Sequence, residues 1–217
     1  MRLRPAGAVA LTVDRNFVQI AATMTVAIAK IIWVLGCVGW YAIRYPHQRR
    51  ARRTPVAERR ERLRERILVA ISASGLGVVP ALYVSTRWLG FADYPFHPLQ
   101  AWLGVAVLIA AWALFYRTHR DLGRAWSVTL EIRKEHRLVA HGIYTRLRHP
   151  MYAAFWVWAL AQALLLPNWI AGFAGLVGFG TLFFARVGHE ERMMLEAFGD
   201  EYRAYMRRTW RVIPGVY

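Results

Sequence analysis

The sequence contains a single cysteine, Cys37, and 13 acidic residues against 29 lysines and arginines. One cysteine excludes an intramolecular disulfide framework and any metal site built from a cysteine cluster. Hydrophobic residues make up 57% of the chain. This content argues against disorder, because disordered chains combine low hydrophobicity with high charge. A formal net charge of +16 would suit nucleic acid as a partner, so the placement of the basic residues has to decide what they contact.

Long stretches with almost no charged residue divide the chain into predicted membrane spans. They are residues 26–45, 67–89, 98–116 and 151–185. A bilayer core needs about 20 apolar residues per helix. The 35 residues of 151–185 are therefore better explained by a helical hairpin that turns at Pro167 and Asn168 than by one helix. The sequence predicts five spans.

The basic residues are concentrated between these spans. Segment 44–66 holds ten, 117–150 holds eight and 186–217 holds six, whereas residues 90–97 and the turn at Pro167 hold none. In a five-span topology these three segments lie on one side, and the positive-inside rule places that side in the cytoplasm. The basic excess is thus an orientation signal and a contact for membrane lipids, and we do not expect nucleic acid as a partner.

Ionisable groups that could support chemistry are concentrated in residues 117–150 and in the tail. Taken alone, His149 before Pro150 is an interfacial histidine at a helix start. Arg186 and Glu190 are four residues apart, which on a helix predicts a surface ion pair. A metal site of His136, His141 and His149 is not favoured, because their spacings of five and eight match no common metal motif. Three glycines at three-residue intervals, Gly172, Gly175 and Gly178, predict close helix packing.

Two sequence motifs, taken together, indicate a family more specifically than their single residues do. Gly-x-Tyr-x-x-x-Arg-His-Pro-x-Tyr runs from Gly142 to Tyr152, and Glu190-Glu191 is followed by Phe-Gly-x-x-Tyr-x-x-Tyr, which ends at Tyr205. Both strings, in this order and separated by a hairpin, resemble the isoprenylcysteine carboxyl methyltransferase family, which is related to phospholipid N-methyltransferases. The resemblance covers about residues 117–210.

The resemblance implies an S-adenosylmethionine site at the cytoplasmic membrane surface. The residues that match the family's cofactor contacts are His136, Arg137, Leu138, Val139, Tyr144, His149, Pro150, Met151, Tyr152 and Glu190. Arg186 matches the catalytic arginine that is assigned to the substrate carboxylate, and no metal is implied. One departure is Thr129, which stands where the eukaryotic branch carries a glutamine. No Gly-x-Gly-x-x-Gly string follows a strand, so the soluble Rossmann-type methyltransferase architecture is not supported.

The fold expected on these grounds is an all-α integral membrane protein. About five transmembrane helices would be followed by a cytoplasmic C-terminal helix that caps a membrane-surface cofactor site. One membrane domain would cover residues 1–217, with the first three spans in 26–116 and the cofactor-binding and catalytic region in 117–210. In a bacterial host this would be the inner membrane.

The expected activity is S-adenosylmethionine-dependent methylation of a lipophilic or lipidated acceptor, with carboxyl O-methylation of an isoprenylcysteine-like substrate first. The alternatives are N-methylation of a phospholipid or another small lipid, and an NADPH-dependent membrane reductase of the sterol type. The natural acceptor and the oligomeric state are left open by the sequence.

Overall fold

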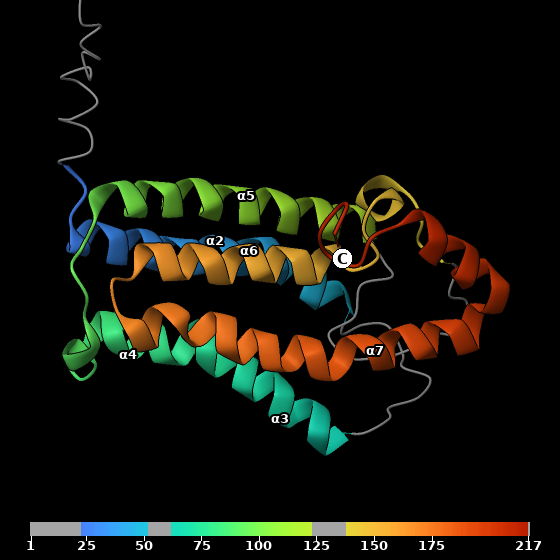
Figure 1. Ribbon diagram of the computed structural model, residues 1–217, viewed down its shortest axis with the longest axis horizontal. Coiled ribbons are helices and arrows are strands. Elements are labelled where there is room, and N and C mark those ends of the chain that lie inside the picture. The colour runs from blue at the N-terminus through green and yellow to red at the C-terminus, as the bar shows by residue number, and fades with distance from the viewer. Residues whose placement is uncertain (1–22, 52–61, 123–137, 217) are drawn as a thin grey trace, which may run out of the picture.

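The computed structural model describes residues 23–51, 62–122 and 138–216, and long helices dominate this part of the chain (Figure 1). In chain order they are α2 (Val26–Ala51), α3 (Arg62–Ala73), η1 (Ser74–Val78), α4 (Val79–Ser85), η2 (Gly90–Ala92), α5 (Pro98–Leu122), η4 (Gly142–Thr145), α6 (Pro150–Leu165) and α7 (Trp169–Arg208). No strand is assigned among these residues, and the predicted all-α fold is confirmed.

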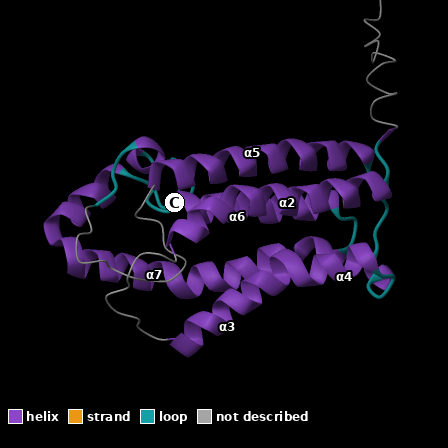
Figure 2. Ribbon diagram, turned by 180° about the vertical axis from the view of Figure 1, so that it is seen from behind, coloured by secondary structure: helices purple, strands orange, loops and turns teal. Residues whose placement is uncertain are grey.

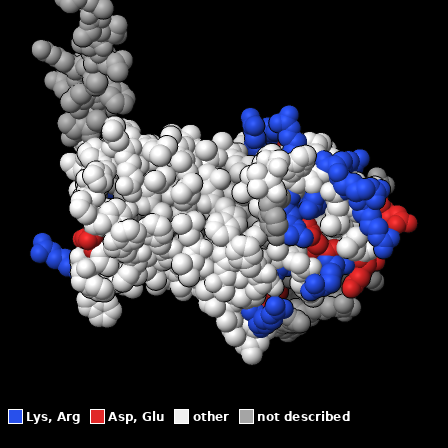
Figure 3. All heavy atoms as spheres, viewed as in Figure 1, with Lys and Arg blue, Asp and Glu red and all other residues white. Residues whose placement is uncertain are grey.

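Within residues 23–51, 62–122 and 138–216, four helical segments are long and apolar enough to cross a membrane. They are Val26–Arg49, Leu63–Ser85, Pro98–Leu122 and Trp169–Arg208. The fifth apolar helix, α6, has 16 residues, which at the α-helical rise correspond to roughly 24 Å. Figure 3 shows that most of the charged side chains on one face gather at the end of the molecule beside the last part of α7, with a small group at the opposite end, and that the band between them is almost free of charge. The chain is thus an integral membrane protein.

The helices form two groups that meet along α6 and α7. Helices α2, α5 and α6 lie side by side, and α7 lies beside the continuous helix made by α3, η1 and α4 (Figures 1 and 2). The predicted hairpin is confirmed, because α6 ends at Leu165 and α7 begins at Trp169. Asn168 caps α7 by accepting hydrogen bonds from the backbone N–H groups of Ile170 and Ala171 at 3.0 and 2.8 Å. Such a cap satisfies two amides that have no partner within the helix.

The second span contains a π-helical turn, η1, where it crosses α7. A Cβ atom at Gly75 would overlap the carbonyl oxygen of Ala174, and one at Gly178 would lie 2.8 Å from the carbonyl oxygen of Ile71. The two backbones therefore touch, as the glycine spacing predicts. The Gln162 side chain donates to the carbonyl oxygens of Gly75 at 3.1 Å and of Ala171 at 2.8 Å. This buried amide ties η1 to both helices of the hairpin.

We expect Gly75→Ala to destabilise the protein by about 1–3 kcal/mol, because the new methyl group forces two packed backbones apart. The matched control is Gly77→Ala in the same turn, where an added Cβ meets no atom within 4 Å. That variant should keep the wild-type stability. Thermal unfolding in detergent measures both, and an equal loss in the two variants would contradict the close crossing of η1 and α7.

The end of the chain folds back on the entrance to α6. Gly199 has φ 50° and ψ −121°, and this bend reverses the direction of α7. The backbone N–H groups of Arg148 and His149 then donate to the carbonyl oxygens of Trp210 and Arg211 at 2.7 and 2.9 Å. Positive φ favours glycine, so the reversal depends on that residue. The residues after α7 thus pair with the segment that leads into α6.

Candidate active site

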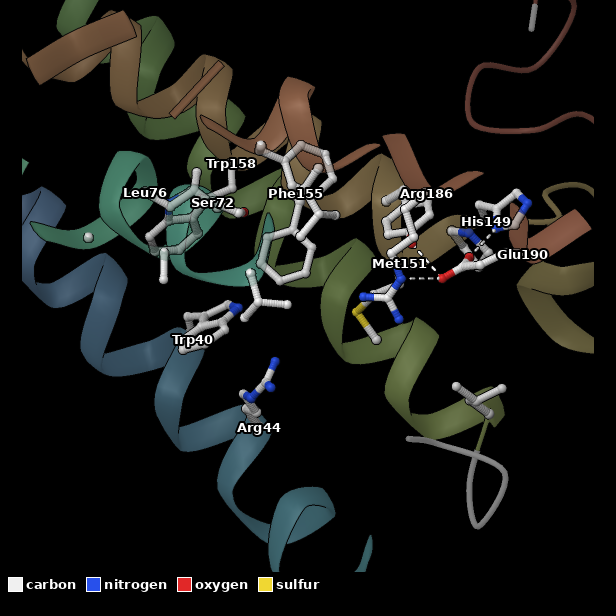
Figure 4. A pocket seen from close by; sticks show the side chains of 18 of the residues that line it. Trp40, Arg44, Ser72, Leu76, His149, Met151, Phe155, Trp158, Arg186 and Glu190 are labelled. Atoms are coloured by element: carbon white, nitrogen blue, oxygen red, sulfur yellow. Dashed lines mark hydrogen bonds and ion pairs between the residues drawn. The ribbon is translucent and has the colours of Figure 1, made fainter. Parts of the chain in front are cut away.

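A cavity of about 630 Å³ lies between α2, α3 with η1, α6 and α7. This volume falls in the range of small-molecule sites. Its walls change in character along its length. Leu76, Trp158 and Phe155 line one part, whereas Arg186, His149 and Glu190 form the other (Figure 4). An occupant would therefore meet apolar groups at one end and ionic groups at the other.

Glu190 is the centre of the ionic end. The Tyr152 hydroxyl donates to its Oε1 atom at 2.6 Å, and the Arg186 Nε atom lies 2.8 Å from the same oxygen. Arg186 also forms an ion pair with Glu65 of α3, with 3.4 Å between Nη2 and Oε1. The i,i+4 ion pair predicted on α7 is confirmed, but its side chains are only 12% and 18% exposed, so it is not a surface pair. Two carboxylates surround one guanidinium, which leaves a formal charge of −1.

His149 stands between two adjacent carboxylates. Its Nδ1 atom lies 3.5 Å from Glu190 and its Nε2 atom 3.5 Å from Glu191. The imidazole stacks on the Tyr152 ring, with 5.5 Å between centroids and 18° between planes. Pro150 follows as the first residue of α6, where the missing N–H has no intrahelical partner. The histidine therefore faces the cavity and is more than an interfacial residue at a helix start.

Glu191, one residue beyond Glu190, holds the tail in place. Its carboxylate accepts from Arg148 Nε at 3.1 Å and from Arg211 Nη2 at 2.6 Å. The apolar part of α7 ends at residue 185, so this cluster lies outside the membrane-spanning segment. Burial alone would raise the pKa of Glu191, but hydrogen bonds from His149, Arg211 and Arg148 lower that pKa well below its ordinary value. Arg148 Nη1 also donates to the carbonyl oxygens of Met206, at 3.0 Å, and Thr209.

The Gly142–Thr145 turn places Tyr144 against the cavity. The backbone N–H of Ile143 donates to Asp121 Oδ2 at 2.8 Å, which fixes the turn on the end of α5. The Tyr205 hydroxyl donates to the Tyr144 carbonyl oxygen at 2.7 Å, so the tail holds this turn as well. Burial raises the pKa of the Tyr144 phenol, which therefore stays protonated at neutral pH.

The structure brings most of the predicted site residues together. Tyr144, Arg186 and Glu190 line the cavity, as do all four residues from His149 to Tyr152. Leu138 and Val139 are half-buried in the loop before η4 and are not among the cavity-lining residues. His136, Arg137 and Thr129 lie outside the described residues.

Sequence reasoning missed three parts of this site. Trp40 and Arg44 of α2 line the cavity, Glu65 of α3 pairs with Arg186, and Arg211 reaches Glu191 from the last residues of the chain. Arg44 was counted only as an orientation signal at the end of a span. Arg44 follows Cys37 by seven residues, which is two turns of a helix. This spacing could have predicted that the two side chains lie on the same face of α2.

Comparison with known proteins finds a family match over the part of the chain from α5 to the middle of α7. The profile of the isoprenylcysteine carboxyl methyltransferase (ICMT) family matches residues 102–196. A protein from Oryza sativa subsp. indica, named as a probable protein-S-isoprenylcysteine O-methyltransferase, is 31% identical over 131 residues, which are 59% of this chain and 69% of that protein. The chain belongs to the isoprenylcysteine carboxyl methyltransferase family.

Two further relatives match over shorter regions. The protein-S-isoprenylcysteine O-methyltransferase of Dictyostelium discoideum is 35% identical over 91 residues, which are 40% of this chain and 37% of the relative. Protein-S-isoprenylcysteine O-methyltransferase B of Arabidopsis thaliana is 33% identical over 96 residues, 43% of this chain and 49% of the relative. The chain thus spans between a third and a half of the length of these two relatives. Their names give no support to the phospholipid N-methyltransferase and reductase alternatives.

The family match and the cavity coincide only in part. Tyr144, His149, Arg186 and Glu190 lie within the matched residues 102–196, whereas α2, α3 and Arg211 lie outside them. Most of the ionic end of the cavity therefore lies within the matched range, and Glu65 lies outside it. One apolar wall belongs to the part of the chain that the profile does not match.

Proposed function

We propose that this protein is an S-adenosylmethionine-dependent methyltransferase that acts on the carboxylate of an isoprenylcysteine-like, lipophilic acceptor. One observation carries the proposal: an apolar cavity between membrane helices ends at the Glu190 cluster, which lies in the residues matched by the family. An amphiphile with a long apolar chain and a polar head fits these two ends. The proposal includes the whole chain acting as one membrane domain.

The ionic end suits a cationic methyl donor. The carboxylates of Glu190 and Glu65 around Arg186 leave a formal negative charge beside the aromatic ring of Tyr152. A negative group and an aromatic ring both attract a cation. The residues that would hold the cofactor are His136, Arg137, Leu138, Val139, Tyr144, His149, Pro150, Met151, Tyr152 and Glu190. S-Adenosylmethionine, when bound, supplies an electrophilic methyl group on a sulfonium sulfur.

The protein's main task in such a reaction is alignment. An ionised carboxylate is already a nucleophile, so no side chain has to remove a proton from the acceptor. Orientation alone supplies about 7–11 kcal/mol in favourable systems. Arg186 lies beside Glu190 at 2.8 Å and borders the cavity, where it would hold the acceptor carboxylate next to the cofactor site. A guanidinium suits this role because it binds carboxylates through two parallel hydrogen bonds.

The acceptor chain would enter sideways from the lipid, between α2 and α3. At the other end of the membrane α2 meets α4, where Lys30 Nζ donates to the Tyr83 carbonyl oxygen at 3.2 Å and lies 3.9 Å from the centre of the Tyr83 ring. Nearer the ionic end both helices border the cavity. In Figure 1, α3 diverges from α2 toward that end. This arrangement supports a side entrance for a hydrocarbon chain.

The test is methyl transfer from radiolabelled S-adenosylmethionine to an N-acetylated, S-farnesylated cysteine by the protein in lipid nanodiscs. We expect base-labile label in the acceptor, which is the signature of a methyl ester. Arg186→Ala should raise the acceptor concentration needed while the affinity for the cofactor is kept. The control variant is Arg203→Ala, whose side chain is 62% exposed on the tail. Label on an amine, or no transfer to any lipophilic acid, would contradict the proposal.

The proposed orientation places the ionic end of the cavity in the cytoplasm. In a background without Cys37, we expect a cysteine at the exposed Phe91 to react with an impermeant thiol reagent in intact cells. A cysteine at Arg203 should react only after the membrane is permeabilised. Labelling of intact cells followed by mass spectrometry makes the comparison, and the reverse pattern would place the site outside.

A further inference from the structure

The apolar end of the cavity is formed by four helical segments, each of which contributes one last residue. Counted from the ionic end, the last lining residues are Cys37 of α2, Gly77 of η1, Trp158 of α6 and Phe179 of α7. Figure 4 shows Trp158 at the end opposite to Glu190. Three of these four residues fill space with a thiol or an aromatic ring, whereas Gly77 has no side chain. A Cβ atom added at Gly77 would meet no atom within 4 Å. Gly77 therefore leaves open space at this end of the cavity.

Gly77 lies on the face of the second span that borders the cavity. The lining residues of this span recur at intervals of three and four, a spacing that keeps them on one side of a helix. They are Val69, Ser72, Ala73, Leu76 and Gly77. Gly75 instead meets the backbone of α7, because residues two apart on a helix point roughly 200° apart. The two glycines of this turn thus have different effects: Gly75 lets α7 approach, and Gly77 leaves room on the side of the cavity.

The distance from Arg186 to Gly77 matches the length of a long prenyl chain. The backbone of Gly75 packs between Ala174 and Gly178 of α7, which places Gly77 about level with Ala174. Arg186 lies twelve residues beyond Ala174, which corresponds to roughly 18 Å at the helical rise. An extended chain spans about 1.2 Å per bond, the value of an extended peptide. From an acceptor carboxylate at Arg186, a ten-carbon geranyl thioether would reach roughly 13 Å and a twenty-carbon geranylgeranyl thioether roughly 23 Å.

We propose that Gly77 sets the length of the hydrocarbon chain that the cavity accepts. The far end of a long acceptor chain would lie in the space beside Gly77, whereas a geranyl chain would end before it. The inference rests on the proposed function, since it names the chain-length class of the acceptor of that site. A larger side chain at position 77 would occupy the same space and exclude long chains by overlap, which is a direct way to build specificity into a site.

The experiment measures binding of tritiated N-acetyl-S-geranylcysteine and N-acetyl-S-geranylgeranylcysteine to the protein in nanodiscs, without S-adenosylmethionine. The two probes share one head group and differ only in chain length. The variants are Gly77→Leu and the smaller Gly77→Ala. The control is Val78→Phe, which adds as many carbon atoms as Gly77→Leu to an exposed side chain of the same turn. Each variant is judged by its ratio of the two affinities relative to the wild-type ratio, so partitioning of the probes into lipid cancels.

We expect Gly77→Leu to bind the geranylgeranyl probe roughly 10- to 200-fold more weakly, the effect of a misfit in an apolar pocket, and to keep its affinity for the geranyl probe. Gly77→Ala should show a smaller loss in the same direction, and Val78→Phe should keep the wild-type ratio. An unchanged ratio in Gly77→Leu would overturn the inference and leave the space to membrane lipid. A wild type that does not bind the longer probe would also overturn it. Chain-length selection without methyl transfer would leave the inference standing and contradict only the proposed reaction.

Discussion

Replacing Glu190 by alanine should abolish S-adenosylmethionine binding while the protein stays folded. At the cavity wall, the Glu190 carboxylate accepts a hydrogen bond from the Tyr152 hydroxyl at 2.6 Å and forms an ion pair with Arg186 at 2.8 Å. In the variant the remaining charges would no longer favour a cationic ligand. Arg186 keeps Glu65 as a partner, so no guanidinium is left buried without a carboxylate. Two hydrogen bonds from the cofactor to this carboxylate, at about 1.5–3 kcal/mol each, would be lost, which predicts an affinity at least roughly 100-fold lower.

Equilibrium binding of radiolabelled cofactor to the purified protein measures this effect, with thermal unfolding as the check on folding. Glu190→Gln separates charge from shape, because its amide oxygen can still accept the Tyr152 hydroxyl. We expect that variant to lose affinity as well. The control is Glu196→Ala, an exposed residue on the same helix. Wild-type affinity in Glu190→Gln would mean that the negative charge does not hold the cofactor.

Replacing Glu191 by alanine should damage the fold more than any change at Glu190. Its side chain is 6% exposed and is the carboxylate partner of both Arg148 and Arg211. Removing one member of a buried ion pair costs about 3–5 kcal/mol, because the remaining charge stays buried without compensation. Here two guanidiniums lose the same partner, and the contact between the last residues and the start of α6 should open.

Hydrogen exchange gives a local measurement of that opening. The amides of Arg148 and His149 donate to the carbonyl oxygens of Trp210 and Arg211, so they should exchange faster in Glu191→Ala. Thermal unfolding should show the global loss, with Glu201→Ala, an exposed residue of the tail, as control. Protected amides and an unchanged melting temperature in Glu191→Ala would show that the ion cluster does not hold the tail.

The pKa of Glu191 also sets the direction of a pH effect. Its folded-state pKa is lowered from an ordinary value of 4.5. The stabilisation by this carboxylate is therefore fully present above that value and is lost as the pH falls through the folded-state pKa. We expect the stability difference between wild type and Glu191→Ala to be constant near neutral pH and to shrink in acid. A difference that grew with acidification would contradict the assignment.

The two adjacent glutamates show where sequence reasoning stops. The Glu190-Glu191 pair was recognised as part of one string, and the i,i+4 spacing correctly placed Arg186 beside Glu190. Neighbouring residues on a helix point about 100° apart, so only one of them can face the cavity. Which one does so depends on how α7 is rotated against α6, and this is a property of the packing.

The sequence by itself determined the membrane class, the spans, the hairpin at Asn168 and the family, because these depend on local hydrophobicity, charge and short strings. Tertiary structure alone decided which distant groups meet. Arg44 and Glu65 reach the cavity because α2 and α3 border it, and Arg211 reaches Glu191 because the chain reverses at Gly199. Such contacts join segments up to well over a hundred residues apart. Short sequence patterns cannot predict them, because they depend on how whole helices pack against one another.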